Sequence, residues 1–363
     1  MTASPVMIEA RGLAKRFPVG GGLLRKARLL HAVDGVDLAI RKGETFAIVG
    51  ESGCGKSTLA RLLMRLLEPT EGSIRIDGDD ISTVTGSALK SLRRDVQFIF
   101  QDPFSSLNPR LSVARLVGEP LEAHRPELSP GQRRDEVAGL LRQVGLRPEH
   151  MDRYPHEFSG GQRQRIGIAR ALASGPKVLI GDEPVSALDV SVQAQVVNLL
   201  SDLRDSLGLT LVVIAHDLAI IRQMSDRIAV MYLGRVVETG PTDQIFGNPH
   251  HPYTRALLAA IPGPDGGGGA SLSGETPSPI DPPSGCHFRT RCPHAVDACA
   301  EARPPLEETG DGSAVACIRW REIGSGAGAL PDPAHRSPGA QARFQLYRDA
   351  LANGAAQPTQ QET

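Results

Sequence analysis

The chain lacks any long apolar segment. Its 363 residues contain no run of eighteen apolar residues, so we expect no helix that spans a membrane. It also lacks an excess of charge, because 40 basic and 41 acidic residues leave a net charge of −1, which argues against an overall nucleic-acid-binding surface. The start, Met1-Thr-Ala-Ser-Pro-Val6, has neither the positive charge nor the apolar core of a signal peptide. We therefore expect a cytoplasmic protein that reaches a membrane only through its partners.

Cysteine is scarce, but four of the five cysteines gather in the last quarter: Cys286, Cys292, Cys299 and Cys317. Reducing conditions argue against disulfides, so this quartet indicates metal binding. The spacing C-x5-C-x6-C-x17-C lacks the paired CxxC motifs of common zinc sites. Iron–sulfur clusters accept four thiolates at irregular spacing. On spacing alone, a [4Fe–4S] cluster, a zinc ion and free thiols all remain open.

The most informative segment is Gly50-Glu-Ser-Gly-Cys-Gly-Lys-Ser-Thr58. It stands between the apolar run 45–49 and a helical pattern over 59–67, so it predicts a strand, a glycine-rich loop and a helix. Backbone N–H groups of such a loop wrap around phosphate oxygens, with Lys56 at the β- and γ-phosphates and the Ser57 hydroxyl on Mg²⁺. The predicted nucleotide-binding residues are Gly50, Glu51, Ser52, Gly53, Cys54, Gly55, Lys56, Ser57 and Thr58.

Two acids end a second apolar run, Lys177-Val-Leu-Ile-Gly-Asp-Glu-Pro184. The run predicts a buried parallel strand with the acids at its carboxyl end. Asp182 is predicted to hold Mg²⁺, directly or through water, and Glu183 to polarise the attacking water. Nucleotide hydrolysis requires a metal clamp and an oriented nucleophile, so these acids complement the phosphate loop.

A further segment, Ser159-Gly-Gly-Gln162, begins an apolar-periodic helix with serine as its cap. Its exposed N–H groups would form a second anion site, although one nucleotide needs only one phosphate loop. With this segment added to the phosphate loop and the two acids, the chain resembles the ATP-binding cassette (ABC) ATPases. The resemblance implies that this segment caps the ATP held by the opposite subunit, through Ser159, Gly160, Gly161 and Gln162.

Three further residues match the same family in order. Phe17 corresponds to the aromatic residue that stacks on adenine. Gln101 corresponds to the glutamine that senses the γ-phosphate and joins Ser57 and Asp182 at Mg²⁺. His216 corresponds to the histidine that contacts the γ-phosphate. The resemblance thus implies Glu183, His216 and Gln101 as catalytic residues.

Strands alternate with helices along residues 1–240, so we expect an α/β cassette with a mostly parallel sheet and antiparallel edge strands. The segment from Met7 resembles an edge strand, and about 104–165 reads as a helical subdomain. Residues 241–325 form an extension with the four cysteines, after a Pro/Gly-rich linker at 262–285. The tail 326–363 is expected to be partly disordered.

The extension narrows the resemblance. The segments His251-Pro-Tyr-Thr-Arg-Ala-Leu257 and Gly285-Cys-His-Phe-Arg-Thr-Arg-Cys-Pro293 are similar to the C-terminal region of oligopeptide/dipeptide importer ATPases. This implies an ATPase coupled to peptide import at the cytoplasmic face of the inner membrane. Its partners would be a like or unlike second cassette, two membrane permeases and a solute-binding protein. A [4Fe–4S] cluster on the four cysteines is implied as well, either as a structural staple or as a regulatory module.

Two alternatives stay open. Importers of nickel, oligosaccharides or opines share this ATPase subfamily, and cargo is chosen by the binding protein and the permeases. A soluble ABC ATPase of DNA repair or translation is the rival of another class. Such chains usually carry two cassettes or a large insertion, and this chain has neither.

Overall fold

The computed structural model describes residues 4–20, 27–102, 106–186, 188–215, 217–260 and 274–324. An eight-stranded sheet forms its centre, in the order β11-β12-β10-β9-β3-β8-β7-β6. The strands are β3 (Thr45–Val49), β6 (Val96–Ile99), β7 (Val178–Asp182), β8 (Thr210–Ile214), β9 (Arg227–Tyr232), β10 (Arg235–Pro241), β11 (Glu307–Glu308) and β12 (Ala314–Val315). The five strands from β9 to β6 are parallel and the other three are antiparallel. The predicted α/β class, with a mostly parallel core and an antiparallel edge, is confirmed.

A second, antiparallel sheet has the order β2-β1-β4-β5. Its strands are β1 (Val6–Val19), β2 (Arg28–Arg41), β4 (Glu71–Ile76) and β5 (Asp79–Asp80). The prediction of an edge strand at the start of the chain is wrong, because β1 lies between β2 and β4 and pairs with both. A 14-residue strand with bulges can pair on both sides although its own sequence shows only one apolar face.

Strand β3 shows how the core is divided. Successive side chains of a strand point to opposite faces of the sheet. Phe46 and Ile48 therefore enter a core shared with the second sheet, whereas Ala47 and Val49 enter a core shared with the helical subdomain. All five β3 residues are buried, which explains the unbroken apolar run before the phosphate loop.

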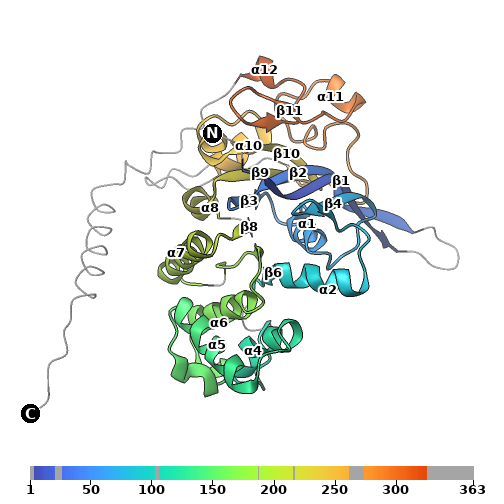
Figure 1. Ribbon diagram of the computed structural model, residues 1–363. Coiled ribbons are helices and arrows are strands. Elements are labelled where there is room, and N and C mark those ends of the chain that lie inside the picture. The colour runs from blue at the N-terminus through green and yellow to red at the C-terminus, as the bar shows by residue number, and fades with distance from the viewer. Residues whose placement is uncertain are drawn as a thin grey trace, which may run out of the picture.

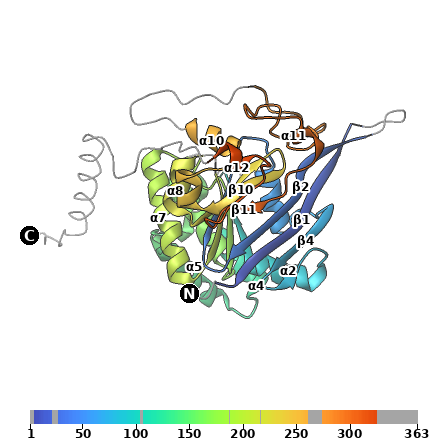
Figure 2. The ribbon, with the colours of Figure 1, turned by 90° about the horizontal axis from the view of Figure 1, so that it is seen from above.

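Helices cover both faces of the central sheet. Around it lie α1 (Lys56–Leu63), α2 (Gly86–Asp95), α7 (Val190–Leu207), α8 (Leu218–Met224), α9 (Thr242–Gly247) and α10 (Pro252–Ala259). Seen from above, α7 and α8 lie on the flank opposite β1, β2 and β4 (Figure 2). The helical subdomain contains α4 (Val113–His124), α5 (Pro130–Gln143), η1 (Pro148–Asp152), η2 (Pro155–Glu157) and α6 (Gly160–Leu172). Its helices α4, α5 and α6 pack together at the end of the molecule farthest from the extension (Figure 1). Across the described ranges, no helix has both the length and the apolar character needed to cross a membrane.

The extension continues the central sheet. Besides α9 and α10 the extension contains β11, β12, α11 (Ala298–Glu301) and α12 (Trp320–Ile323), and these later elements lie above β9, β10 and α10 (Figure 1). Strand β12 pairs with β10, with Glu238 opposite Val315. Strand β10 spans the expected domain boundary at residue 240, so the cassette and the extension share one sheet.

An aromatic cluster packs the junction between cassette and extension. The ring centroids of Tyr232, Tyr253 and Phe288 lie 4.7, 5.2 and 5.4 Å apart, and all three side chains are fully buried. The chain has only four tyrosines and nine phenylalanines, so this cluster concentrates a scarce residue type. Tightly packed rings of this kind fix the position of the elements that carry them.

Candidate functional site

The phosphate loop follows β3 and ends at α1, as predicted. Two of its glycines could carry no side chain, because a Cβ on Gly50 would lie 2.1 Å from the Met231 carbonyl oxygen and one on Gly55 2.0 Å from that of Ala32. Gly55 also has a φ of 105°, which disfavours any L-residue. The loop therefore depends on glycine both for its backbone shape and for its close approach to β2 and β9.

Lys56 is buried at the first position of α1, with 7% of its surface exposed. Its Nζ donates to the carbonyl oxygens of Gly50 at 2.8 Å and Glu51 at 2.9 Å. The ammonium thus lies inside the curve of the loop, where a phosphate group would meet it.

Ser57 and Asp182 meet although 125 positions separate them, with the Ser57 hydroxyl donating to Asp182 Oδ1 at 3.0 Å. Burial raises the pKa of the Asp182 carboxyl, which is only 6% exposed. A bound cation would offset this cost of burying the charge. The structure therefore brings together a hydroxyl and a carboxylate, two oxygen ligands suited to Mg²⁺.

Glu183 sits beside this pair in a strained conformation, with a φ of 48°. Gln101 Nε2 donates to Glu183 Oε2 at 2.7 Å, and the Glu183 backbone N–H donates to the Ile214 carbonyl at 2.8 Å. Left-handed conformations of non-glycine residues cluster at functional sites. The amide of Gln101 is thus directed to Glu183, which it holds in place from the end of β6.

Ser159 caps α6 in a reciprocal arrangement. Its hydroxyl accepts from the Gln162 N–H at 3.4 Å, and Gln162 Oε1 accepts from the Ser159 N–H at 3.1 Å. A Cβ on Gly161 would lie 2.4 Å from Val192 Cγ1, so a glycine here allows α6 to approach α7 closely. Among the described residues, no hydrogen bond joins 159–162 to the phosphate loop at 50–58. The segment 159–162 belongs to the helical subdomain, whereas the loop 50–58 lies between β3 and α1 at the central sheet (Figure 1).

Phe17 lies half-buried on β1 opposite Leu30, with the Lys15 ammonium 5.2 Å from its ring centroid. Cys54 is buried inside the loop, and burial raises the pKa of its thiol, which makes a reactive thiolate there unfavourable. His216 lies outside the residues that the structure describes.

The four extension cysteines are all free and line one small cavity together with His251 and Phe288. The Cys286 N–H donates to the Cys299 carbonyl at 2.8 Å, which ties two of the cysteine-bearing segments together. Burial, and to a smaller extent the other three cysteines, raise the pKa of the Cys317 thiol to about 11. In the part of the chain that the structure describes, no three His, Cys, Asp or Glu side chains are grouped so that they could hold a metal ion. The expected ligand cluster is therefore not assembled among the described residues.

One set of contacts is absent from the sequence-based predictions. Arg291 donates to both carboxylate oxygens of Glu51, at 2.7 and 3.0 Å, and the Glu51 N–H donates to the Tyr253 hydroxyl at 2.9 Å. Tyr253 belongs to the segment 251–257 and Arg291 immediately precedes Cys292, but neither position signals a contact with a loop more than 200 residues away. Only the tertiary structure reveals that the extension touches the phosphate loop.

A phosphate loop after a central strand, acids at the end of β7 and a capped glycine segment on a helical subdomain define an ABC ATPase. Among solved structures, an ATP-binding cassette dimer bound to ADP and phosphate, MJ0796, superposes with a TM-score of 0.58 and 31% identity, covering 65% of this chain and 99% of that one. Residues 33–186 match the family model "ABC transporter".

The extension identifies the branch of the family. Residues 237–299 match the model "Oligopeptide/dipeptide transporter, C-terminal region". The chain is 50% identical to the oligopeptide transport ATP-binding protein OppF of Salmonella typhimurium over 86% of its own length and 96% of that protein. It is 48% identical to a probable peptide ABC transporter ATP-binding protein of Sinorhizobium fredii, over 97% and 98%. The chain belongs to the ATP-binding subunits of the oligopeptide/dipeptide ABC transporter family.

Proposed function

We propose that the chain is the ATP-hydrolysing subunit that powers peptide import through an ABC transporter, at the cytoplasmic face of the cell membrane. One observation supports the chemistry. The Ser57 hydroxyl of the phosphate loop donates to Asp182, and Gln101 donates to Glu183, the residue after Asp182, so these four residues form one continuous series. Peptide as the cargo class is supported by the names of the relatives, which match this chain along almost their whole length.

In the proposed reaction, residues 50–58 bind the phosphates of ATP and Phe17 stacks on the adenine. Phosphate oxygens are stronger acceptors than carbonyl groups, so ATP draws the Lys56 ammonium from the Gly50 and Glu51 carbonyls to its β- and γ-phosphates. Ser57, Asp182 and Gln101 would hold Mg²⁺, which neutralises phosphate charge when bound. Nothing in this arrangement requires the loop to unfold.

Glu183 then orients the attacking water and accepts its proton. Gln101 senses the γ-phosphate, and His216 contacts it. The Ser159–Gln162 segment acts in trans on ATP held by a second cassette, like or unlike. This role is supported by the position of the segment at the start of α6 in the helical subdomain, with no hydrogen bond among the described residues to the loop at 50–58 of the same chain. Closure of two cassettes on ATP drives the permeases between access states, because ATP binds the closed form more tightly than the open form.

We assign the following domain layout to a subunit with this function. Residues 1–240 form the cassette, about 104–165 its helical subdomain, and 241–325 the extension, with 326–363 as a tail. Two membrane permeases and a solute-binding protein complete the importer, and they select the cargo.

Co-purification from gently solubilised native membranes tests this assignment. We expect mass spectrometry to find two permeases and a second cassette with the tagged chain, and the solute-binding protein then distinguishes peptide from nickel, oligosaccharide or opine cargo. As a control, an untagged chain processed identically should recover none of them. Recovery of soluble or nucleic-acid-associated partners alone would overturn the transport assignment.

We further propose that the four cysteines hold a [4Fe–4S] cluster that staples the extension. Backbone N–H groups point at three of the sulfurs and favour their thiolate forms; the donors are Phe288, His294 and Arg319, toward Cys286, Cys292 and Cys317. Four free thiols around one cavity are a suitable donor set. Thiolates repel one another, so the metal must supply the energy that draws them into a ligand set.

Anaerobic purification followed by iron and sulfide analysis tests the cluster. We expect about four iron atoms and four sulfides per chain. Cys292→Ser should lose most of the iron, whereas Cys54→Ser, a cysteine of the phosphate loop, should keep it. Zinc in place of iron, or neither metal nor sulfide, would contradict the proposal.

A further inference from the structure

Glu51, the second residue of the phosphate loop, is held at three of its groups. Its carboxylate accepts two bonds from Arg291, its N–H donates to Tyr253, and its carbonyl oxygen accepts from Lys56 Nζ at 2.9 Å. Thr276 also donates to the carboxylate at 3.3 Å. The first two contacts come from the extension and the third is the loop's own lysine, so Glu51 connects the extension to Lys56 in two steps.

The Arg291–Glu51 contact is stronger than an ordinary surface ion pair. The Arg291 side chain is only 4% exposed and that of Glu51 is 24% exposed. Two parallel charge-assisted bonds fix both distance and direction, and partial burial protects them from screening. The bonds to Glu51 raise the pKa of Arg291 above its ordinary value, so the guanidinium stays charged at every relevant pH.

Arg291 and Tyr253 are themselves held rigidly. The Arg291 guanidinium lies 5.8 Å from the Tyr232 ring centroid, and Arg291 Nη1 donates to the Tyr232 hydroxyl at 3.4 Å. Tyr253 packs against Tyr232 and Phe288, and its N–H donates to His251 Nδ1 at 3.0 Å. The aromatic cluster thus gives the two groups that hold Glu51 a fixed base.

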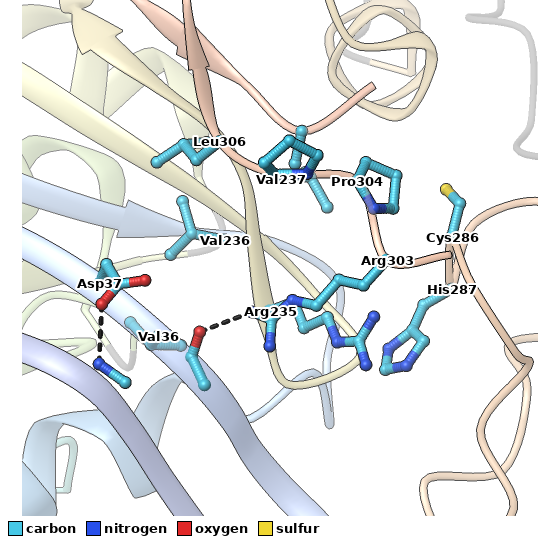
Figure 3. A pocket seen from close by; sticks show the side chains of 14 residues that line it. Val36, Asp37, Arg235, Val236, Val237, Cys286, His287, Arg303, Pro304 and Leu306 are labelled. Carbon is cyan, nitrogen blue, oxygen red and sulfur yellow. Dashed lines mark hydrogen bonds between the residues drawn. The ribbon is translucent and has the colours of Figure 1, made fainter. Parts of the chain in front are cut away.

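The junction between cassette and extension is not close-packed throughout. A cavity of about 640 Å³ lies between β2, β10 and the extension. Figure 3 shows Arg235 from β10 and Arg303 from the extension reaching into it, with Val36 and Leu306 on its walls. The extension therefore meets the cassette at discrete points, and Glu51 is a contact that lies inside the predicted nucleotide site.

We propose that Arg291 and Tyr253 are positioning residues through which the extension holds the phosphate loop ready for nucleotide. The inference rests on the proposed ATPase function. Held at its N–H and its carboxylate, Glu51 fixes the backbone at the start of the loop before nucleotide arrives, so the loop loses little freedom when ATP or ADP binds. Coupling between two sites is reciprocal, so bound nucleotide must in turn stabilise the extension.

The test uses the full chain with Mg²⁺ and either ADP or ATP. We expect Arg291→Met to weaken both nucleotides about tenfold and Tyr253→Phe, which removes only the acceptor hydroxyl, about threefold. Arg291→Lys should recover part of the loss, because it restores the charge without the two-pronged geometry. The matched control is Arg321→Met, which breaks an exposed ion pair with Glu307 in the same extension and should leave the nucleotide affinities unchanged. In the assembled transporter the KM for ATP should rise while kcat changes little.

Hydrogen exchange supplies a readout that a merely structural role would not move. ADP should slow exchange over residues 286–299 in the wild type and in Arg321→Met, but not in Arg291→Met. If Arg291→Met fails to fold, Tyr253→Phe and Glu51→Gln carry the affinity test, and the wild-type exchange experiment stands alone. Unchanged affinities in the folded variants, or no slowing over 286–299 in a wild type that binds ADP, would overturn the proposal. A wild type that binds no nucleotide would instead overturn the ATPase assignment.

Discussion

Glu183→Gln is expected to abolish turnover while ATP still binds. The substitution keeps the size of the side chain and a carbonyl oxygen that Gln101 can donate to, but it removes the carboxylate that would accept the proton of the attacking water. Loss of a general base lowers such rates by about 10² to 10⁴-fold. Phosphate release by the assembled transporter should fall by that factor, whereas the Kd for ATP should change by less than about threefold.

The same variant should accumulate the closed form. ATP that is bound but not hydrolysed keeps two cassettes together, so size-exclusion chromatography with ATP and Mg²⁺ should show a dimer that the wild type forms only transiently. Glu68→Gln is a suitable control, because the Glu68 side chain is 82% exposed and lies outside the site. Turnover close to that of the wild type would remove Glu183 from the catalytic role.

Gly55→Ala is expected to have the largest effect on the nucleotide site itself. The new methyl group would collide with a backbone carbonyl 2.0 Å away, which cannot turn aside as a side chain could, and φ would stay at 105°. Steric conflict and backbone strain together should cost about 4 kcal/mol of stability. Equilibrium urea unfolding should show the loss, and binding of fluorescent ATP analogues should disappear even where the variant remains folded.

Gly53→Ala separates the two causes. Gly53 has a φ of 78° but no atom within 4 Å of the position that a Cβ would take. Only backbone strain remains, so we expect a loss of about 1 kcal/mol. Equal losses in the two variants would show that contact with β2 does not constrain the loop.

The sequence alone was enough to predict the chemistry of this chain. A phosphate-binding loop needs glycines, a lysine and a hydroxyl at fixed short spacing, and acids at a strand end need only an apolar run before them. These are local requirements, so Gly50–Thr58, Asp182 and Glu183 could be predicted as site residues without coordinates. The strand-and-helix alternation likewise predicted the α/β class, because periodicity is a local property.

The tertiary structure determined which residues contact one another and which strands pair. The pairing of Ser57 with Asp182 was expected, but the direct bond from Gln101 to Glu183 depends on how β6 and β7 lie side by side. The interior position of β1 likewise depends on β4, which no pattern within β1 encodes. Contacts across many residues follow from packing of the whole chain, and no local pattern records them.

The extension shows the same division most clearly. Its cysteines and its His-Pro-Tyr-Thr-Arg segment were visible as motifs, and they sufficed to place the chain among peptide-importer ATPases. The contacts of Arg291 and Tyr253 with Glu51 depend on the tertiary structure, in which β12 pairs with β10 and the aromatic cluster packs the junction. An ion pair between residues 240 positions apart has no sequence signature, since its two partners owe their proximity to the fold around them.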